Sequence, residues 1–468
     1  MFKIRQIVLI VLFLAQGIFK VLKESGDFSQ LEEQLSYLIH QGVGMLISFA
    51  LDEIDRKLLA QKDQGLKVIG KRQRTLITTA GEIKVNRRLY QNQEGEYIFL
   101  LDEALGLEPR LRVSKRMQEL MLELATEMPF RRAAKVLGYI TPLVSPMSVW
   151  TAVKAAGEEA CAETLKLKTE VFENGVVPEG QRSVNRLFIE GDEVHVKQQR
   201  GSCKNLGIKL VVGYEGKVGS RRKLKNRHSV AGVTDGPGIW EEASCVFSQK
   251  WLLSELEQVR IGGDGAPWIK KGTEVFPGAS YHLDPFHLRK RLTEALSFSC
   301  ELYENVCRGL RQLDKEAVVK TLDDSSKLLR GARKKRVKDL KRYLMDNWSG
   351  ISNLPEDERL GAIEGQVRHT IARRMKRIGA RWTVEGGDRM GRLLAAKAND
   401  ELTRYVNKSK ISIEKLLESD EPIKKETTCS KDVESWLKAS MPALVGPSAG
   451  KPWVKYVLRE IGSIKWPA

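Results

Sequence analysis

The spacing of apolar residues predicts a helical start to the chain, followed by a small sheet. Residues 1–70 carry apolar side chains at helical intervals, and a capping box of Ser29 and Glu32 predicts the start of one helix. The apolar run at residues 7–15 predicts a further helix, buried in the protein. Residues 71–113 change to short strand-like runs and predict an antiparallel β module with strands at 75–78, 83–90 and 97–101.

Residues 114–170 return to helical spacing and predict a DNA-binding region of the helix-turn-helix type. Two short helices are separated by a glycine-containing break. Any three-helix bundle shows the same periodicity, so both interpretations stay open at this point. In a helix-turn-helix, a DNA groove would face Ser148, Thr151 and Lys154, and phosphates would lie near Arg131 and Arg132.

The pattern from residue 187 onward predicts a mixed α/β core. A polar stretch with glycine and proline at 171–186 predicts a linker before it. Three strand-like runs, a helix and two more strand-like runs follow, at 187–196, 206–214, 228–233, 249–259, 260–264 and 280–283. We divide this part into a first core segment at 187–298, a basic helical insertion at 299–356 and a last core segment at 357–400. The tail at 401–468 has no pattern that we interpret.

Composition narrows the class of protein. The 468 residues are 42% hydrophobic and 29% charged, which is typical of a folded multidomain protein and excludes disordered, collagenous and polytopic membrane proteins. The net charge of +18 favours a polyanionic partner, above all nucleic acid. Six cysteines lie far apart without a Cys-x-x-Cys pair, so we expect reduced thiols and no zinc site.

Two short runs hold two-thirds of that net charge. Residues 331–342 contain seven lysines or arginines and one aspartate, and residues 368–381 contain six with no acid. A solvated helical face would explain either run alone, but both lie beside the candidate carboxylates, where a phosphate backbone would approach. The residues predicted to bind DNA are Arg333, Lys334, Lys335, Arg336, Arg373, Arg374, Arg377, Arg381 and Trp382, together with Arg131 and Arg132.

The first twenty residues bear on where in the cell the protein is located. Lys3 and Arg5 precede the apolar run, as in a secretory signal, but no small-x-small cleavage site follows and the run is too short to span a bilayer. We therefore expect a cytoplasmic, nucleoid-associated protein with no membrane partner. A secreted or membrane-anchored basic protein is the alternative that these residues leave open.

Three carboxylates lie in settings that favour metal chemistry. Asp192 interrupts an otherwise apolar strand, where an unpaired carboxylate is costly unless it is solvated, paired or bound to a cation. Asp264 stands between glycines just after a short strand, and Glu364 opens a late helix. Together they could hold two Mg²⁺ ions through oxygen ligands, with Mn²⁺ as a substitute, and support phosphodiester chemistry. Glu190 or Glu193 could share the role of the first ligand.

At these residues the sequence resembles bacterial insertion-sequence transposases of the ISLre-two type, which were long known as an uncharacterised protein family and are distantly similar to Mutator-like transposases. The likeness extends over most of residues 1–400. The motifs that carry it are Phe188-Ile189-Glu190 before Asp192; Gly263-Asp264-Gly265-Ala266 with Trp268-Ile269-Lys270; Asp284-Pro-Phe-His287; and Glu364-Gly365 with Val367, His369, Arg374-Met375 and Trp382.

The resemblance implies a ribonuclease-H-like core with a metal-binding triad of Asp192, Asp264 and Glu364. It further implies a DNA transposase that cleaves strands at insertion-sequence ends and transfers them into target DNA. Double-stranded DNA would then be the partner, and the protein would act on it as a homo-oligomer. His287 would support the chemistry near the scissile phosphate, with Asp284 orienting it.

Two alternatives remain at this level. The chain could be a DNA-binding regulator in which the helix-turn-helix does the work and the carboxylates are structural. It could also be a catalytically inactive remnant of a transposase. A regulator would bind DNA equally well in EDTA and would never nick it.

Overall fold

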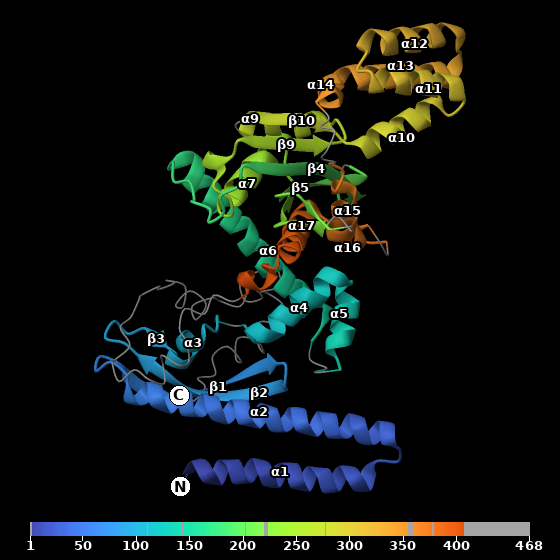
Figure 1. Ribbon diagram of the computed structural model, residues 1–468. Coiled ribbons are helices and arrows are strands. Elements are labelled where there is room, and N and C mark those ends of the chain that lie inside the picture. Colours follow the sequence, from blue (N-terminus) through green and yellow to red (C-terminus); the bar gives the residue numbers. More distant parts are fainter. Residues whose placement is uncertain are drawn as a thin grey trace, which may run out of the picture.

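The computed structural model describes residues 2–109, 111–139, 141, 144–201, 203–219, 223–276, 278–353, 360–376 and 379–406. Within these residues the protein is mixed α/β and multidomain, as the sequence predicts. A helical hairpin with a small sheet, a three-helix bundle, a five-stranded core and a helical arm follow one another (Figure 1). The tail after residue 406 lies outside the described residues, and so does Arg377.

The N-terminal part is a hairpin of two long helices covered by a small sheet. The predicted antiparallel sheet is confirmed, because its middle strand pairs antiparallel with both neighbours. The second helix begins earlier than predicted: its N-cap is Asp27, whose side chain accepts from the backbone N–H of Gln30, so Ser29 lies inside the helix. The elements are α1 (Phe2–Glu24), α2 (Phe28–Ala60), β1 (Lys67–Thr78), β2 (Gly81–Gln91), β3 (Tyr97–Ile98) and α3 (Leu100–Leu105).

The apolar run at residues 7–15 does form a helix, but the prediction that this helix is buried is wrong. It lies in α1, which packs on α2 at the end of the molecule (Figure 1). Ile7 is 47% exposed and Leu9 is 53% exposed. Among the helices of the described ranges, none is long and apolar enough to cross a membrane.

Three helices form the predicted bundle, and they are packed into the core. They are α4 (Lys115–Glu127), α5 (Phe130–Leu137) and α6 (Pro146–Lys168). One apolar cluster continues from Met121 and Val149 in the bundle to Phe188 and Met390 in the core. The predicted linker is also in contact with the core, because the backbone of Arg182 bridges to that of Trp251. The bundle is therefore fixed against the core rather than tethered to it.

The core sheet combines antiparallel and parallel strands in the order β10-β9-β4-β5-β8. β5 pairs antiparallel with β4 and β8, whereas β9 runs parallel to β4 and β10. The strands are β4 (Arg186–Lys197), β5 (Asn205–Tyr214), β8 (His228–Gly232), β9 (Gln258–Gly263) and β10 (Ala279–Leu283), with a two-stranded ribbon of β6 (Lys217–Val218) and β7 (Lys223–Leu224) beside them. All five predicted strands of the core are present.

The helix between these strands was predicted in the wrong place. The structure has α7 (Gly236–Ser248), whereas residues 249–259 hold a single 3₁₀ turn and the start of β9. α7 begins with Gly-Pro-Gly, a sequence that is typical of a turn. Asp235 nevertheless caps the helix by accepting from the backbone N–H of Gly238, and Pro237 fits its first turn because no N–H donor is needed there.

A helical arm projects beyond the β10 edge of the sheet (Figure 1), and its helices begin at Pro285, earlier than the start at residue 299 predicted for the basic insertion. Its elements are α10 (Pro285–Leu296), α11 (Cys300–Arg311), α12 (Lys315–Leu328), α13 (Gly331–Asp346) and α14 (Trp348–Ser352), after the short α8 (Pro267–Lys270) and α9 (Gly272–Val275). The chain then returns to the core as α15 (Ile363–Val367), a π-helical turn (Arg368–Ala372), α16 (Arg373–Met375) and α17 (Val384–Ala398).

Candidate metal-binding site

Three aspartates lie where the parallel part of the sheet ends: Asp192 in β4, Asp264 directly after β9 and Asp284 directly after β10. β4 and β9 pair with an offset of 72 residues, as in Glu190 opposite Gly262. Asp192 and Asp264 each lie two residues beyond this last pair, Asp192 within β4 and Asp264 directly after the end of β9. β10 pairs with β9 at an offset of 20, and Asp284 follows β10 directly, where its backbone N–H donates to the carbonyl of Gly263 at 2.8 Å. The carboxyl ends of parallel strands are where α/β sheets bind their ligands.

The structure brings Asp192, His287 and Glu364 to one point. One candidate ligand atom from each of these side chains lies within 4.8 Å of the other two. Asp264, the second predicted ligand, is outside that tight group, and its carboxylate accepts from the backbone N–H of Ala266 at 2.9 Å. Its charge nevertheless acts on both Asp192 and His287. The four predicted residues therefore form one site, in which His287 rather than Asp264 completes the closest group.

Glu190 holds the segment that leads into the helix of Glu364. Its carboxylate is 1% exposed and accepts hydrogen bonds from three consecutive backbone N–H groups. Those donors precede or begin α15, so the carboxylate caps the start of this helix and satisfies N–H groups that would otherwise lack partners. The donors are the backbone nitrogens of Gly361 at 2.8 Å, Ala362 at 2.9 Å and Ile363 at 3.2 Å.

One strand thus sets the position of two predicted ligands. Glu190 and Asp192 are two residues apart in β4 and share a face of the sheet. Glu190 is therefore a positioning residue and not a ligand, which sequence analysis did not recognise. Glu193 faces the other way and approaches Lys209 at 3.9 Å, so it does not share the ligand role either. The sequence signal that could have found this clamp, meaning the Glu190 carboxylate that holds the start of α15, is a second carboxylate two residues before a candidate ligand in an apolar strand.

A glycine makes the turn before α15 possible. Gly361 has φ of +102°, which side chains with a Cβ rarely adopt. A Cβ at this position would also meet Oδ1 of Asp284 at 3.0 Å. The backbone can therefore pass between Asp284 and the Glu190 carboxylate, which brings Glu364 to the strand ends.

Burial and neighbouring charge make Asp192 costly to ionise. Burial is the largest cause that raises its pKa, to about 6, and the negative charges of Asp264 and Glu364 add to this effect. The backbone N–H of Glu193 donates to Asp192 at 2.7 Å and works against the shift. Within the described part of the chain, no lysine or arginine forms an ion pair with Asp192, Asp264 or Glu364. A divalent cation would supply the missing positive charge, so these carboxylates fit a hard cation that prefers oxygen ligands.

His287 is held in place by a buried acid. Its Nδ1 lies 2.6 Å from Oδ2 of Asp284, a side chain that is buried and also caps α10. This contact is the one predicted from the sequence, and it leaves Nε2 as the ring nitrogen available to a ligand. The hydrogen bond to Asp284 is the main cause that raises the pKa of His287, and the charges of Asp192 and Asp264 contribute further.

The helical arm is joined to the candidate site at its base. The hydroxyl of Tyr343 in α13 donates to the backbone carbonyl of Asp264 at 2.9 Å. Asn347 packs against Gly265, whose φ of +98° shapes the turn after Asp264. The base of the arm therefore contacts the turn that carries Asp264.

Two of the predicted DNA-binding residues are in the wrong place for that role. Arg374 is 7% exposed, its Nε donates to the carbonyl of Ala125 at 2.6 Å, and its guanidinium lies against the rings of Phe130 and Trp382. Trp382 is 8% exposed and donates to the carbonyl of Met375. Both side chains join the bundle to the core, so we withdraw them from the DNA-binding set. Their spacing beside basic residues gave no indication of burial.

The other predicted DNA contacts are accessible within the described residues. On α13, Lys334 is half-buried and the three arginines and lysines around it are exposed. They stand about 10–15 Å along the helix from Tyr343. Arg373 is exposed but pairs with Glu127 at 3.4 Å. The other exposed ones are Arg131, Arg132, Arg333, Lys335, Arg336 and Arg381.

The proposed groove-facing residues lie at the free end of α6. Thr151 is exposed, although its hydroxyl donates to the carbonyl of Met147, and Lys154 approaches Glu158 at 3.7 Å. Ser145 caps α6 by accepting from the backbone N–H of Ser148. The geometry therefore leaves this end of the helix open to a partner.

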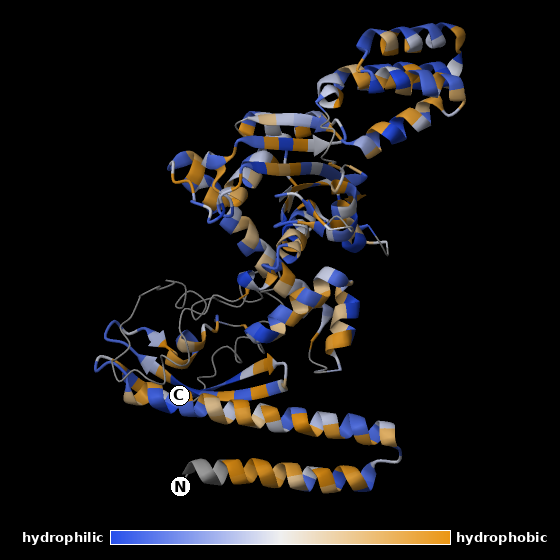
Figure 2. Ribbon diagram, in the orientation of Figure 1, coloured by the Kyte–Doolittle hydropathy of each residue, from blue (hydrophilic) through white to orange (hydrophobic). Residues whose placement is uncertain are grey.

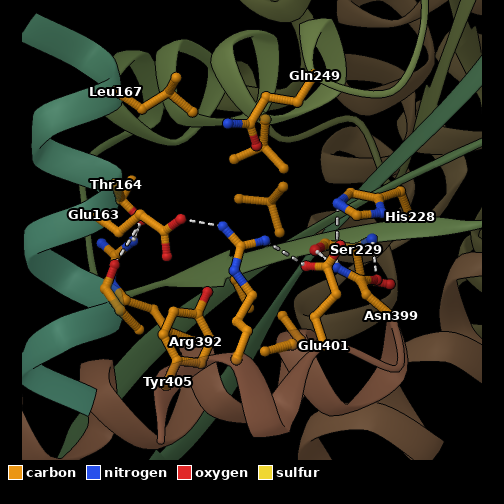
Figure 3. Close-up of a pocket in the computed structure, with 17 residues that line it drawn as sticks. Glu163, Thr164, Leu167, His228, Ser229, Gln249, Arg392, Asn399, Glu401 and Tyr405 are labelled. Atoms are coloured by element: carbon orange, nitrogen blue, oxygen red, sulfur yellow. Dashed lines mark hydrogen bonds and ion pairs between the residues drawn. The ribbon is translucent and has the colours of Figure 1, made fainter. Parts of the chain in front are cut away.

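A separate pocket of about 60 Å³ lies between α6, β8 and α17, away from the carboxylates. Arg392 and His228 lie on its walls (Figure 3). Arg392 is paired with Glu242 at 2.8 Å and with Asp388 at 3.1 Å, which leaves it no free charge for a ligand. Burial and nearby positive charges lower the pKa of His228 to about 4, so this histidine is neutral in the folded protein.

Acid should destabilise the protein through His228. Between its usual pKa of 6.5 and the folded value of about 4, the unfolded chain binds a proton that the folded chain excludes. Stability present above pH 6.5 is therefore lost as the pH falls towards 4, by about 3 kcal/mol. Urea unfolding at about pH 7 and about pH 4.5 measures this loss. His228→Gln should reduce it, whereas His195→Gln on the surface should not; equal losses in all three proteins would contradict the assignment.

The fold and the site define a multidomain α/β protein with a carboxylate and histidine cluster at the ends of parallel strands. Residues 21–411 match the uncharacterised protein family UPF0236, and the chain belongs to this family. A UPF0236 protein of Caldanaerobacter subterraneus subsp. tengcongensis is 30% identical over 362 residues, which cover 75% of each chain.

Two further relatives extend this likeness. A second UPF0236 protein of the same bacterium is 28% identical over 388 residues, covering 81% of this chain and 79% of the relative, and its name joins eleven loci. A UPF0236 protein in the vanSb 3′ region of Streptococcus gallolyticus is 26% identical over 423 residues, covering 85% of this chain and 91% of the relative.

Proposed function

We propose that the protein is a metal-dependent DNA transposase with a ribonuclease-H-like core. The observation that carries the proposal is the cluster of Asp192, His287 and Glu364, with Asp264 beside it and no lysine or arginine in an ion pair with these carboxylates among the described residues. Carboxylates this close together repel one another and reduce the stability of the folded protein unless a cation is bound. Phosphodiester chemistry is a common use of two hard cations held by such side chains.

The division of labour follows from the positions of the residues. Asp192, Asp264 and Glu364 would hold two Mg²⁺ ions, which supply an activated hydroxyl nucleophile and a stabilised leaving oxygen. His287, held by Asp284, has a raised pKa that favours its charged form, which suits a contact with a phosphate oxygen. Hydrolysis at an element end would free a 3′-hydroxyl, and this hydroxyl would then attack a target phosphodiester and displace its 3′ oxygen.

The multiplicity of the relatives supports a mobile element. One relative's name joins eleven loci of a single bacterium, and another joins four. Repeated copies of a gene within one genome are what transposition produces. The exposed arginines and lysines of α13 and α5 support DNA as the partner, because they can contact phosphates on either side of the site.

The second candidate function is a DNA-binding regulator. The open end of α6 in the three-helix bundle favours it, since this part alone could bind a DNA groove. Such a protein would need no metal. Metal-dependent cleavage is therefore the result that separates the two functions.

A nicking assay tests the proposal directly. The substrate is a supercoiled plasmid that carries this gene with its flanking DNA on both sides, and the control plasmid carries the coding region alone. We expect cuts at the flanks in Mg²⁺ or Mn²⁺ and no cuts in EDTA, mapped by primer extension. Binding to the flanks that is equal in Mg²⁺ and EDTA, without any cut, would favour the regulator and overturn the transposase.

A further inference from the structure

The hairpin of α1 and α2 exposes more apolar surface than a monomer normally tolerates. Figure 2 shows α1 as the most continuously apolar helix of the molecule, with only α2 drawn beside it. Its large apolar residues from Ile7 to Leu22 include eight that are exposed, the most open being Phe19 at 68%. A helix that is apolar on nearly every side is normally buried.

One row of α1 residues contacts α2. A Cβ on Gly17 would meet the side chain of Leu38, and a Cβ on Gly42 would meet Leu14, so small residues let the helices approach closely. Ile10 is buried in the same row. This seam accounts for a single face of α1.

A second row of apolar residues, here called the apolar stripe, consists of the residues one position C-terminal to those of the seam. In α1 it includes Val11, Ile18 and Leu22, with Ala15 between them, at spacings of three or four residues that match a coiled-coil seam. In α2 the same step of one residue leads from Leu38 to Ile39 and from Gly42 to Val43, and Ile39 and Val43 are also exposed. The two helices run antiparallel and pack face to face. A step of one residue towards the C-terminus turns around each helix axis, and in an antiparallel pair both turns lead to the same side of the hairpin. Both rows of exposed apolar residues therefore lie on that side.

The size of this surface matches half of a protein interface. The exposed apolar side chains on this side, each about half exposed, present on the order of 600–700 Å². They are Ile7, Val8, Val11, Ile18 and Leu22 of α1 with Ile39, Val43 and Leu46 of α2. The largest apolar patch of a monomer is usually about 300–600 Å², whereas each partner of a standard dimer buries about 800 Å².

We propose that this side of the α1–α2 hairpin binds the same surface of a second copy, forming a four-helix interface. A two-fold interface pairs identical patches, which suits this stripe because its apolar side chains would then bury one another. The core and the candidate site lie at a distance from the hairpin in the chain's own fold (Figure 1). The inference therefore does not depend on the proposed function.

The test measures the mass of the full-length protein. Sedimentation equilibrium of the wild type should give about twice the chain mass of 52.8 kDa. Ile18→Glu puts a charge in the stripe of both copies and should weaken the dimer at least about 100-fold. Gln16→Glu adds the same charge to an exposed position outside the stripe and should leave the mass unchanged. Because Ile18 is exposed, the helix content should be the same in all three proteins, by circular dichroism.

Other outcomes would overturn the proposal. A wild-type monomer at all micromolar concentrations would show that the hairpin does not self-associate. A monomer that co-sediments with vesicles of phosphatidylglycerol and phosphatidylethanolamine, and loses this with Ile18→Glu, would assign the surface to a membrane. A dimer that both variants leave intact would place the interface elsewhere.

Discussion

Asp192→Asn should abolish DNA cleavage while making the metal-free protein more stable. The loss of activity should be at least about 1,000-fold, because the variant removes a carboxylate from the centre of the proposed metal site. Binding to the same DNA should be unchanged, since the variant leaves the exposed basic residues of α13 and α5 as they are. Gel-based cleavage and fluorescence anisotropy measure the two quantities separately.

The gain in stability follows from the sign of the pKa shift. Asp192 has a folded pKa of about 6, above its usual 3.8, so the folded protein pays for ionising it as the pH rises through 6. The full cost, about 2–3 kcal/mol, is present at neutral pH. Urea unfolding in EDTA should therefore show a more stable Asp192→Asn variant, and added Mg²⁺ should stabilise the wild type much more than the variant.

Glu193→Gln is the matched control for this experiment. It neutralises the next carboxylate of β4, which faces Lys209 on the other side of the sheet. Neither cleavage nor the response to Mg²⁺ should change. Asp264→Asn tests the second ligand, because the amide oxygen can still accept from Ala266. A wild type and an Asp192→Asn variant that respond equally to Mg²⁺ would contradict the metal site.

Glu190→Gln should weaken metal binding although Glu190 does not touch the metal. The amide cannot accept from three backbone N–H groups as the carboxylate does, so the start of α15 loses its anchor and Glu364 shifts. We expect at least about a tenfold rise in the Mg²⁺ concentration for half-maximal cleavage, with about 2 kcal/mol lost from the free energy of unfolding. Metal titrations of the cleavage rate give the first quantity.

Tyr214→Phe is the control for the clamp. It removes a hydrogen bond to the same carboxylate and leaves the bonds to α15 intact. Stability should fall slightly, and the Mg²⁺ requirement should stay at the wild-type value. A Glu190→Gln variant that is less stable but has an unchanged Mg²⁺ requirement would show that Glu190 supports the fold without positioning Glu364.

Much of the site could be predicted because its residues have distinctive local settings. A carboxylate in an apolar strand and an aspartate between glycines are unusual local settings, and they indicated Asp192 and Asp264 as candidate ligands. Burial was harder to predict. Arg374 and Trp382 sit in a basic run that reads as a solvated surface, but the bundle packs over them.

The sequence by itself indicated the order of strands and helices along the chain, the helical arm and the three carboxylates of the candidate site, because strand and helix periods and local chemistry are encoded over a few neighbouring residues. His287 was indicated by the resemblance to a transposase family. Only the tertiary structure decided that Glu190 clamps the approach to Glu364 and that His287 stands closer to Asp192 than Asp264 does. It also decided that α1 leaves its apolar side uncovered. These features depend on contacts between segments far apart in the sequence, such as Glu190 with Gly361, which are 171 residues apart, and local spacing carries no information about them.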